Sequence, residues 1–595
     1  MRSEIEDAHK WDLAHIYPDW DAWSRDVTTL ESEIASYAAL KGTLAHGADR
    51  LLAAFRLNDR LGQIAYKIFF YPSLRYDEDQ RDNNVNGRRQ RVQAIMARWQ
   101  QATSWLNPEL LTIPLETVQA WMNDEPALAV YRFAIEEVYR QQSHVLSEQG
   151  EHLLSLAAPL SSAPGESYLA LSTADARFPE IELSTGERVT ISYGQYRAVL
   201  ATNRHQPDRH AAFLGHYGTY ASTLNTYASL YHGICQRDWF HARARGYAST
   251  LDAALYGDNI PRAVVDNLIA TTRAGVAPLQ RYHRLRRRAL GLDRYCPYDF
   301  SIPLVAWNRR YEYDEVLAPI VESVARLGSD YQARMWRGFN ERWIDVYEND
   351  GKRSGAYSAS VYGVHPYMLL NWADTLDDVF TLAHEMGHSM HTMLTHERQP
   401  FVYSDYTIFV AEVPSTLSEI MLLEHLLERA TDRDERVVLL QHAIDNITST
   451  FYAQVMFADF ELAAHVSVER DEPLTADVLN QLYLDRFQAY YGDAVDVEPL
   501  TAIAWARIPH FFNAPYYVYQ YATCFASAAR LAQAMREGPG AGEARDRYLE
   551  LLSAGGSDHP MTLLRRAGAD LSDPGTVQAI VDQLDRLVSQ LEELV

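Results

Sequence analysis

Residues 381–394 read TLAHEMGHSMHTML, a stretch with two histidines four positions apart and a glutamate beside the first. On an α-helix, positions i and i+4 lie one turn apart on the same face, so His384 and His388 point the same way and can bind one ion. Glu385 lies at the edge of that face, within reach of a metal-bound water rather than the metal. This HExxH pattern predicts two zinc-binding imidazoles and a glutamate that acts as general base.

The element that must position these residues is a helix. Asp377 and Asp378 precede the pattern as N-caps or first-turn acids. A chance HExxH copy would more often lie on a polar surface, whereas this one is typical of a half-buried helix. The apolar residues that recur at helical spacing are Val379, Leu382, Ala383, Met386, Met390, Met393 and Leu394.

A catalytic zinc site needs a third protein ligand and one open position for water. The metzincin pattern HExxHxxGxxH would require glycine at position 391 and histidine at 394. The sequence has His391 and Leu394, which excludes that class. We expect His391, three residues after His388, to be an ordinary helix histidine.

The third ligand is therefore sought among the carboxylates downstream, which are Glu397, Glu412, Glu419 and Glu424. Glu397 is expected to be exposed near the end of the first helix. Glu412 lies in FVAEVPSTLSE, at or just before a helix start, because proline is tolerated in a first turn. Glu419 follows two turns later on the same face. One of this pair can bind the metal while the other orients an imidazole, and the alternative is that both are solvated helix residues.

Composition and charge exclude several other classes. The net charge of −25 argues against nucleic acid as the main partner, because phosphate binding needs a cationic surface. Cys235, Cys296 and Cys524 are few, odd in number and far apart, which suits a reducing cytoplasm. The N-terminal MRSEIEDAHKWDL lacks the apolar core of a signal peptide, and no run of about 20 apolar residues is present. We therefore expect a cytoplasmic protein without a membrane span.

Most of the 595 residues show helical periodicity, and a chain of this length is expected to form two or more lobes. Two segments indicate strands: a hairpin at 178–192, and a Tyr- and Ser-rich stretch at 354–372 with a turn near Gly363. The hairpin is our predicted boundary between an N-terminal helical region, 1–192, and a catalytic region, 193–595. The segments predicted to be helical include 19–40, 78–105, 258–290, 315–335, 415–445 and 575–595.

HEMGH followed by FVAEVPSTLSE resembles the thimet-oligopeptidase-like zinc peptidases, and within them oligoendopeptidase F. The resemblance extends through WDLAHIYPDWDAW, SLRYDED, YDFSIPL, GKRSGAYS, PYMLLNW and HFFNAPYYVYQYATCFA. It implies a mainly α, two-lobed, ellipsoidal fold of the zincin type, with a small β-sheet and a deep central channel. That channel would admit oligopeptides and not folded proteins.

The resemblance also implies roles for individual residues. His384, His388 and Glu412 would bind one zinc ion per chain, Glu385 would be the base, and Glu419 would orient an imidazole. His510 and a tyrosine of PYYVYQY would hydrogen-bond the substrate carbonyl or its oxyanion. Larger relatives carry a Gly-rich loop between these two motifs, and this sequence has only FFNA before the proline, so cleavage preferences do not carry over.

The choice of tyrosine depends on helical facing. If the chain is helical after Pro515, Tyr516 and Tyr519 share one side, and Tyr517 and Tyr521 share another. Alignment of the YYxY core with the family favours Tyr519 first and Tyr517 second.

We therefore predict a zinc-dependent endopeptidase that hydrolyses oligopeptides, with Glu385 activating the water. A carboxydipeptidase with the same zinc chemistry is one alternative, but it needs a cationic anchor for the substrate carboxylate that the sequence does not identify. A non-catalytic peptide-binding protein on the same scaffold is another, although the intact HExxH and Glu412 argue against it.

Overall fold

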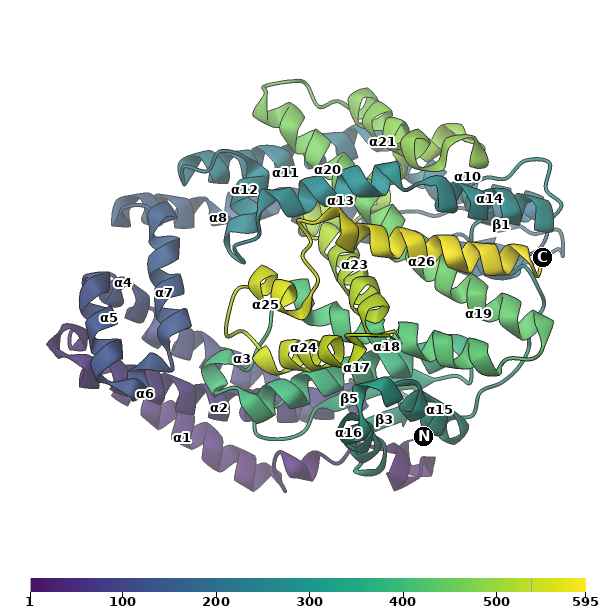
Figure 1. The fold of residues 1–595 in the computed structure, drawn as a ribbon. Coiled ribbons are helices and arrows are strands. Elements are labelled where there is room, and N and C mark those ends of the chain that lie inside the picture. The colour runs from purple at the N-terminus through teal and green to yellow at the C-terminus, as the bar shows by residue number, and fades with distance from the viewer. Residues whose placement is uncertain (1, 537) are drawn as a thin grey trace. The chain divides into compact units, whose positions relative to one another are not determined.

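The computed structural model describes residues 2–536 and 538–595 and is mainly helical (Figure 1). The chain divides into two compact units, each assembled from three stretches. Unit 1 comprises Met1–Ser143, Arg309–His425 and Ala534–Gly568, and unit 2 comprises His144–Asn308, Leu426–Gln533 and Ala569–Val595. The division expected from the sequence is contiguous, and the hairpin at its boundary lies inside unit 2. Within the described residues, no helix combines the length and apolar character needed to cross a bilayer.

Unit 1 holds the HExxH helix, α17, and a three-stranded sheet. Its helices are α1 (Trp20–Ala38), α2 (Ala48–Glu78), α3 (Asn83–Thr103), α4 (Leu106–Leu110), α5 (Leu115–Asp124), α6 (Pro126–Ala129), α7 (Arg132–Gln141), α15 (Tyr313–Ser323), α16 (Ser329–Asn340), α17 (Leu376–Arg398), α18 (Ile408–Arg429, whose last four residues belong to unit 2), α24 (Ala541–Ala554) and α25 (Pro560–Ala567). The first of these helices illustrates how they form: Asp19 caps α1 by accepting the Ala22 N–H at 2.7 Å, and buried Trp23, Val27 and Leu30 follow at helical spacing.

The sheet of unit 1 consists of β3 (Ile344–Tyr347), β4 (Tyr357–Ala359) and β5 (Tyr367–Trp372), in the order β3-β5-β4. The predicted pair is present, since β4 runs antiparallel to β5 with Tyr357 opposite Leu369, and Gly363 in the connection has φ +78°. Strand β3, which pairs parallel to β5, was not predicted. The residues of the central strand from Tyr367 to Leu370 are at most 2% exposed, as expected for a strand covered on both faces. Residues of this sheet share a core with α1 and α2.

Unit 2 contains the predicted hairpin, formed by β1 (Glu180–Glu182) and β2 (Arg188–Thr190) around Gly186, which has φ +84°. Its helices are α8 (Glu148–Leu169), α9 (Tyr193–Thr202), α10 (Gln206–Ala221), α11 (Leu224–Ala244), α12 (Thr250–Tyr256), α13 (Arg262–Ala274), α14 (Ala277–Ala289), α19 (Arg433–Asn446), α20 (Ala453–Glu469), α21 (Ala476–Tyr491), α22 (His510–Asn513), α23 (Tyr519–Ala534, whose last residue belongs to unit 1) and α26 (Pro574–Glu592).

Three segments with continuous helical periodicity are each two helices in the structure. The 258–290 segment breaks at Gly275, where a Cβ would lie 2.7 Å from a methyl carbon of Val581. The 315–335 segment breaks at Gly328, which has φ +100°. The 415–445 segment breaks before Asp432, whose carboxylate caps α19 by accepting the Glu435 N–H at 2.9 Å. Periodicity continues across these breaks because both helices bury an apolar face.

Candidate active site

Helix α17 carries the HExxH residues and begins at Leu376, about two turns before His384. Thr375 is its N-cap, and the reciprocal bonds between Thr375 and Asp378 form a capping box, with distances of 3.2 and 2.9 Å. Asp377 and Asp378 are therefore first-turn acids. The cap fixes the start of the helix, so that His384 and His388 fall on one face with ring centroids 4.9 Å apart.

Helix α18 carries the candidate third ligand, and it starts earlier than the sequence suggested. The prediction placed Glu412 at or just before a helix start, but α18 begins at Ile408 and contains both Glu412 and Pro414. The Thr407 carbonyl accepts the N–H groups of Val410 and Ala411, both at 3.1 Å, which establishes the first turn before the proline. Pro414 then removes only one backbone donor from the helix.

Gly387, between the two histidines, allows α17 and α18 to approach closely. A Cβ at this position would lie 2.7 Å from both the Pro414 carbonyl oxygen and the Ser415 Cα. Backbone atoms cannot move aside as a flexible side chain would. The glycine of HEMGH therefore sets the distance from the histidine pair to Glu412.

We expect Gly387→Ala to separate these two helices, lowering stability by about 1–3 kcal/mol, the usual cost of overpacking, and weakening zinc binding. Gly87→Ala, on α3 of the same unit, is the matched control, because a Cβ there meets nothing within 4 Å. That control should be neutral or slightly stabilising. Thermal unfolding and zinc titration of both variants provide the measurement. Unchanged zinc affinity in Gly387→Ala would contradict the assigned spacing role.

His384, His388 and Glu412 together could hold a metal ion, since one donor atom from each lies within 4.8 Å of the others. The Glu412 Oε2 lies 3.2 Å from His384 Nε2 and 3.3 Å from His388 Nε2. Zinc bonds of about 2.0–2.1 Å in a tetrahedron separate adjacent donors by roughly 3.3 Å, so these spacings fit the ion. The Ser415 hydroxyl donates to Glu412 Oε2 at 2.9 Å and steadies the carboxylate.

The other carboxylates considered from the sequence take different places. Glu419 Oε1 lies 2.6 Å from His384 Nδ1, the ring nitrogen that faces away from the donor group. Glu397 forms an ion pair with Arg334 at 3.0 Å, and 39% of its side chain is exposed, as expected. Glu424 pairs with Arg326 and Arg536. Only Glu412 and Glu419, among the four, contact the imidazoles.

The electrostatics of the donor group favour a cation. Burial acts to lower the pKa of His384, but Glu412 and Glu419 outweigh it and raise that pKa well above its ordinary value. Burial acts to raise the pKa of Glu412, but hydrogen bonds from His384 and His388 hold it far below its ordinary range. A field that favours a proton on an imidazole also favours a divalent cation at the same place.

Glu385 is 8% exposed and stands beside the donor group without belonging to it. Burial raises the pKa of its carboxyl, although His388 and His384 act to lower it, and a backbone hydrogen bond from Ser358 also lowers it. Ser358 lies on β4, the edge strand of the sheet. A carboxylate held in this way can accept a proton from a water near the histidines.

His391 is 1% exposed and stacks on Tyr406, with ring centroids 3.6 Å apart. Burial lowers the pKa of this imidazole to about 3, so it is neutral. Within the described residues, it is not in the candidate metal group. Its role in packing agrees with the prediction.

His510 and the tyrosines predicted to act with it belong to unit 2. His510 begins the short helix α22, and burial lowers the pKa of its imidazole, which keeps it neutral near pH 7. The Tyr521 hydroxyl lies 3.4 Å from His510 Nε2. Tyr517 stacks near the same ring with centroids 5.8 Å apart, and Tyr517 and Tyr521 contact each other at 5.3 Å. The structure thus gathers His510, Tyr517 and Tyr521 into one cluster.

Tyr519, the first choice from the sequence, is 5% exposed at the start of α23. Burial, with smaller contributions from Asp258 and Cys524, raises the pKa of its hydroxyl well above the ordinary value. The sequence argument did not select Tyr521, whose hydroxyl lies 3.4 Å from His510 Nε2. Helical facing had grouped Tyr517 with Tyr521, and this was the signal that could have identified it.

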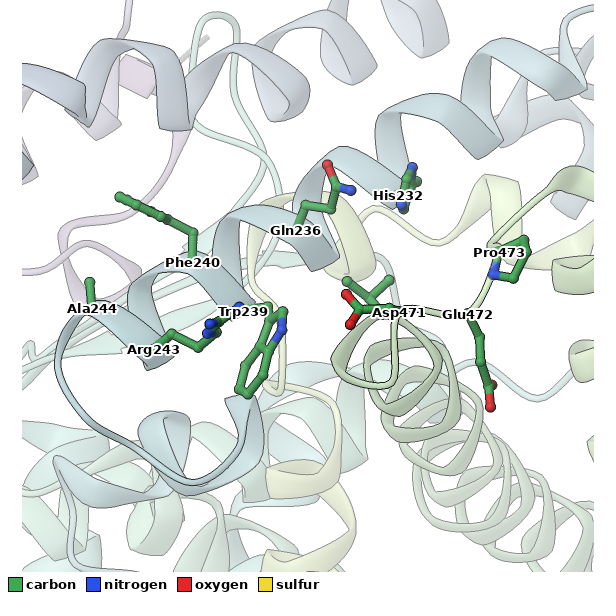
Figure 2. Close-up of a pocket in the computed structure, with 10 residues that line it drawn as sticks. His232, Gln236, Trp239, Phe240, Arg243, Ala244, Asp471, Glu472 and Pro473 are labelled. Carbon is green, nitrogen blue, oxygen red and sulfur yellow. The ribbon is translucent and has the colours of Figure 1, made fainter.

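Two pockets in the described part of the chain are lined by residues outside this site. A pocket of about 790 Å³ lies on unit 2, between one face of α11 and the turn after α20 (Figure 2). Its lining includes Trp239, Phe240, Arg243 and Glu472 but none of the predicted site residues. A smaller pocket of about 330 Å³ lies against Trp336 on α16. The chemistry of the donor set identifies the candidate centre.

Comparison with known proteins identifies the family of the chain. The sequence profile of peptidase family M3 matches residues 199–582, and that of oligopeptidase F matches residues 109–178. Oligopeptidase PepF of Bacillus subtilis is 35% identical over 100% of this chain and 88% of its own length. Group B oligopeptidase PepB of Streptococcus agalactiae is also 35% identical, over 100% and 98%.

Solved structures have the same fold. A protein from Chlamydophila abortus matches with a TM-score of 0.93 and 30% identity, over 100% of this chain and 99% of that one. Oligoendopeptidase-F from Enterococcus faecium matches with a TM-score of 0.73 and 30% identity, over 96% and 98%. With its profile match, its full-length relatives and its fold, the chain belongs to peptidase family M3 and is a metalloendopeptidase of the oligoendopeptidase F type.

Proposed function

We propose that the chain is a zinc-dependent endopeptidase, with one zinc ion per chain, that hydrolyses internal bonds of short oligopeptides. The observation that carries the proposal is the donor group His384, His388 and Glu412, whose spacing of 3.2–3.3 Å fits tetrahedral zinc. The full-length similarity to oligopeptidases supports the substrate class.

When bound, zinc supplies Lewis acidity, which lowers the pKa of a water molecule and polarises a peptide carbonyl. Glu385 takes the proton of the attacking water on its carboxylate and delivers it to the leaving amine. Its burial favours this role because a partly desolvated carboxylate binds a proton more readily than an exposed one. Side chains outside the donor group hold the two histidine rings in the orientation that metal binding needs.

Glu419 acts on His384 and not on the metal. Its contact of 2.6 Å with Nδ1 fixes the ring orientation and presents Nε2 to the donor group. The same bond makes the imidazole more basic and therefore a better ligand.

His510 and a tyrosine of the 510–521 segment act as hydrogen-bond donors to the substrate carbonyl as negative charge develops on its oxygen. Burial keeps His510 neutral, so one ring nitrogen carries a proton that can be donated. Tyr521 joins Tyr517 and Tyr519 as a candidate because it lies 3.4 Å from His510. We place Tyr521 and Tyr517 before Tyr519, whose hydroxyl belongs to a side chain only 5% exposed.

Among the Tyr→Phe variants at 517, 519 and 521, we expect the largest loss of kcat at Tyr521, roughly 10²-fold, since a transition-state donor is typically worth about 3 kcal/mol. KM and zinc content should change little, because the interaction forms only as the reaction proceeds. Steady-state kinetics on one fluorogenic peptide measures the series. A loss of kcat in Tyr519→Phe alone would instead identify Tyr519, the first choice from the sequence, as the hydrogen-bond donor.

The experiment that tests the overall proposal is digestion of a mixed peptide library, including peptides blocked at both ends, with mass-spectrometric detection. We expect internal cleavage of blocked peptides that stops when the metal is removed by a chelator and returns with zinc. Release of dipeptides only from free carboxyl ends would instead identify a carboxydipeptidase. Binding without cleavage would identify a peptide-binding protein.

The location we propose is the cytoplasm. Cys235, Cys296 and Cys524 are buried and form no disulfide within the described residues, which suits a reducing compartment.

A further inference from the structure

A buried carboxylate in unit 2 has no part in the chemistry described above. Glu461, on α20, is 1% exposed, and burial raises the pKa of its carboxyl to about 7. Placing a carboxylate in such surroundings destabilises a fold unless it makes a specific bond. Its Oε1 accepts the backbone N–H of Tyr516 at 2.8 Å, a contact between two buried groups.

Tyr516 adopts a conformation that needs such support. It lies in the connection from α22 to α23, directly before Tyr517, and has φ +57°. A bulky residue in the left-handed region is uncommon and persists only where its surroundings hold it. The Ala514 carbonyl accepts the Tyr517 N–H at 3.2 Å across this turn, which lies between His510 and Tyr521 in the chain and therefore affects how the two side chains meet.

The Tyr516 side chain, like its backbone N–H, is held by a hydrogen bond to a buried group. Thr250, the first residue of α12, donates its only hydroxyl proton to Glu469 at 2.6 Å. The contact of 2.7 Å between the Thr250 and Tyr516 hydroxyls is therefore donated by Tyr516. Glu469 ends α20, the helix that also carries Glu461. One helix thus fixes both the N–H and, through Thr250, the hydroxyl of Tyr516.

A positively charged histidine, His465, packs beside the Tyr516 ring. His465 is fully buried, and its Nδ1 faces the Glu461 carbonyl at 2.9 Å while its Nε2 faces Asp238 at 3.1 Å. Both partners are acceptors, so both ring nitrogens carry protons. The ring lies 4.6 Å from that of Tyr516. Helices α11, α12 and α20, which supply these groups, pack against one another within unit 2 (Figure 1).

We propose that Glu461 is a positioning residue for catalysis: by binding the Tyr516 N–H it holds the left-handed turn that brings Tyr517 and Tyr521 against His510. The inference rests on the proposed donor role of that cluster. Glu461 itself touches no substrate in this scheme. It acts through the backbone of the segment that carries the donors.

The test compares substitutions of Glu461 in the full-length, zinc-loaded enzyme on a fluorogenic peptide. Glu461→Gln keeps an oxygen that can accept the Tyr516 N–H, whereas Glu461→Met has the same length and no acceptor. We expect Glu461→Met to lose kcat roughly 10- to 100-fold, the usual cost of misplacing a catalytic group by about 1 Å. KM should stay within about threefold and zinc content should not change, while Glu461→Gln should retain most of its kcat.

Asp459→Met is the matched control, because Asp459 is also buried on α20 but pairs with Arg273 and Arg486. It should lower the melting temperature without a comparable loss of kcat below that temperature. If Glu461→Met does not fold, Glu461→Asp, which keeps the charge and retracts the acceptor by about one carbon–carbon bond, takes its place and should also fall below Glu461→Gln.

A double variant separates positioning from general stability. If Glu461 acts through Tyr521, Glu461→Met should lower kcat much less in a Tyr521→Phe background than in the wild type. The reason is that both substitutions then remove the same interaction. Three results would each overturn the inference. The first is a double variant whose loss of kcat is the product of the two single losses. The second is a loss of kcat in Glu461→Gln equal to that in Glu461→Met, and the third is a wild-type kcat in Glu461→Met. Failure of the wild-type enzyme to cleave any peptide would instead overturn the proposed function, before any variant is compared.

Discussion

Glu385→Gln is expected to retain zinc and to lose about 10²–10⁴-fold in kcat, the range that general-base catalysis typically contributes. The reason is geometric: Glu385 stands beside the donor group formed by His384, His388 and Glu412 and is not one of its members. Glutamine has the same shape and cannot take a proton from water at neutral pH. Metal analysis of the purified variant and steady-state kinetics give the two measurements.

Glu397→Gln, on the same helix, is the control for this experiment. Its carboxylate is exposed and pairs with Arg334, so both zinc content and kcat should stay near the wild-type values. Zinc lost from Glu385→Gln would show that this residue is a ligand and would reverse its assignment. Undiminished turnover with zinc in place would require another base.

Glu412→Ala is expected to weaken zinc binding more than Glu419→Ala, and to abolish turnover at ordinary zinc concentrations. Glu412 places Oε2 between the two Nε2 atoms, whereas Glu419 contacts only the far nitrogen of His384. Removing a carboxylate that orients a ligand typically costs 10–100-fold in metal affinity, so Glu419→Ala should fall in that range and Glu412→Ala beyond it. Competition with a zinc-binding dye measures both.

Glu424→Ala is the matched control on α18, because that carboxylate pairs with Arg326 and Arg536 and lies outside the donor group. Its zinc affinity should equal that of the wild type. If Glu419→Ala proved to be the weaker binder of the two, Glu419 would be the ligand and Glu412 the residue that orients the ring.

What the sequence could predict about the site was local. The pairing of His384 with His388 follows from helical pitch, and the pairing of Glu412 with Glu419 follows from two turns of the next helix. These relations depend only on backbone geometry within one helix. The hairpin at 178–192 and the β4–β5 pair were predictable for the same reason, since alternation and turn residues are read over short distances.

The tertiary structure decided everything that depends on contacts between elements. It placed Glu412 against both imidazoles and Glu419 behind one of them, a difference set by the close approach of α17 and α18 at Gly387. It brought Tyr521 to His510 while Tyr519, two residues earlier on another side of the same helix, became buried. Helical facing separates these two tyrosines, and only packing determines which of them meets His510.

The compact units could not be derived from the sequence either. Each unit draws on three stretches of chain, and neither composition nor periodicity marks where the chain leaves one unit for the other. Strand β3 was missed because it pairs with β5, more than 20 residues away in the chain. Periodicity records which face of an element is buried, and only packing determines which other element buries it.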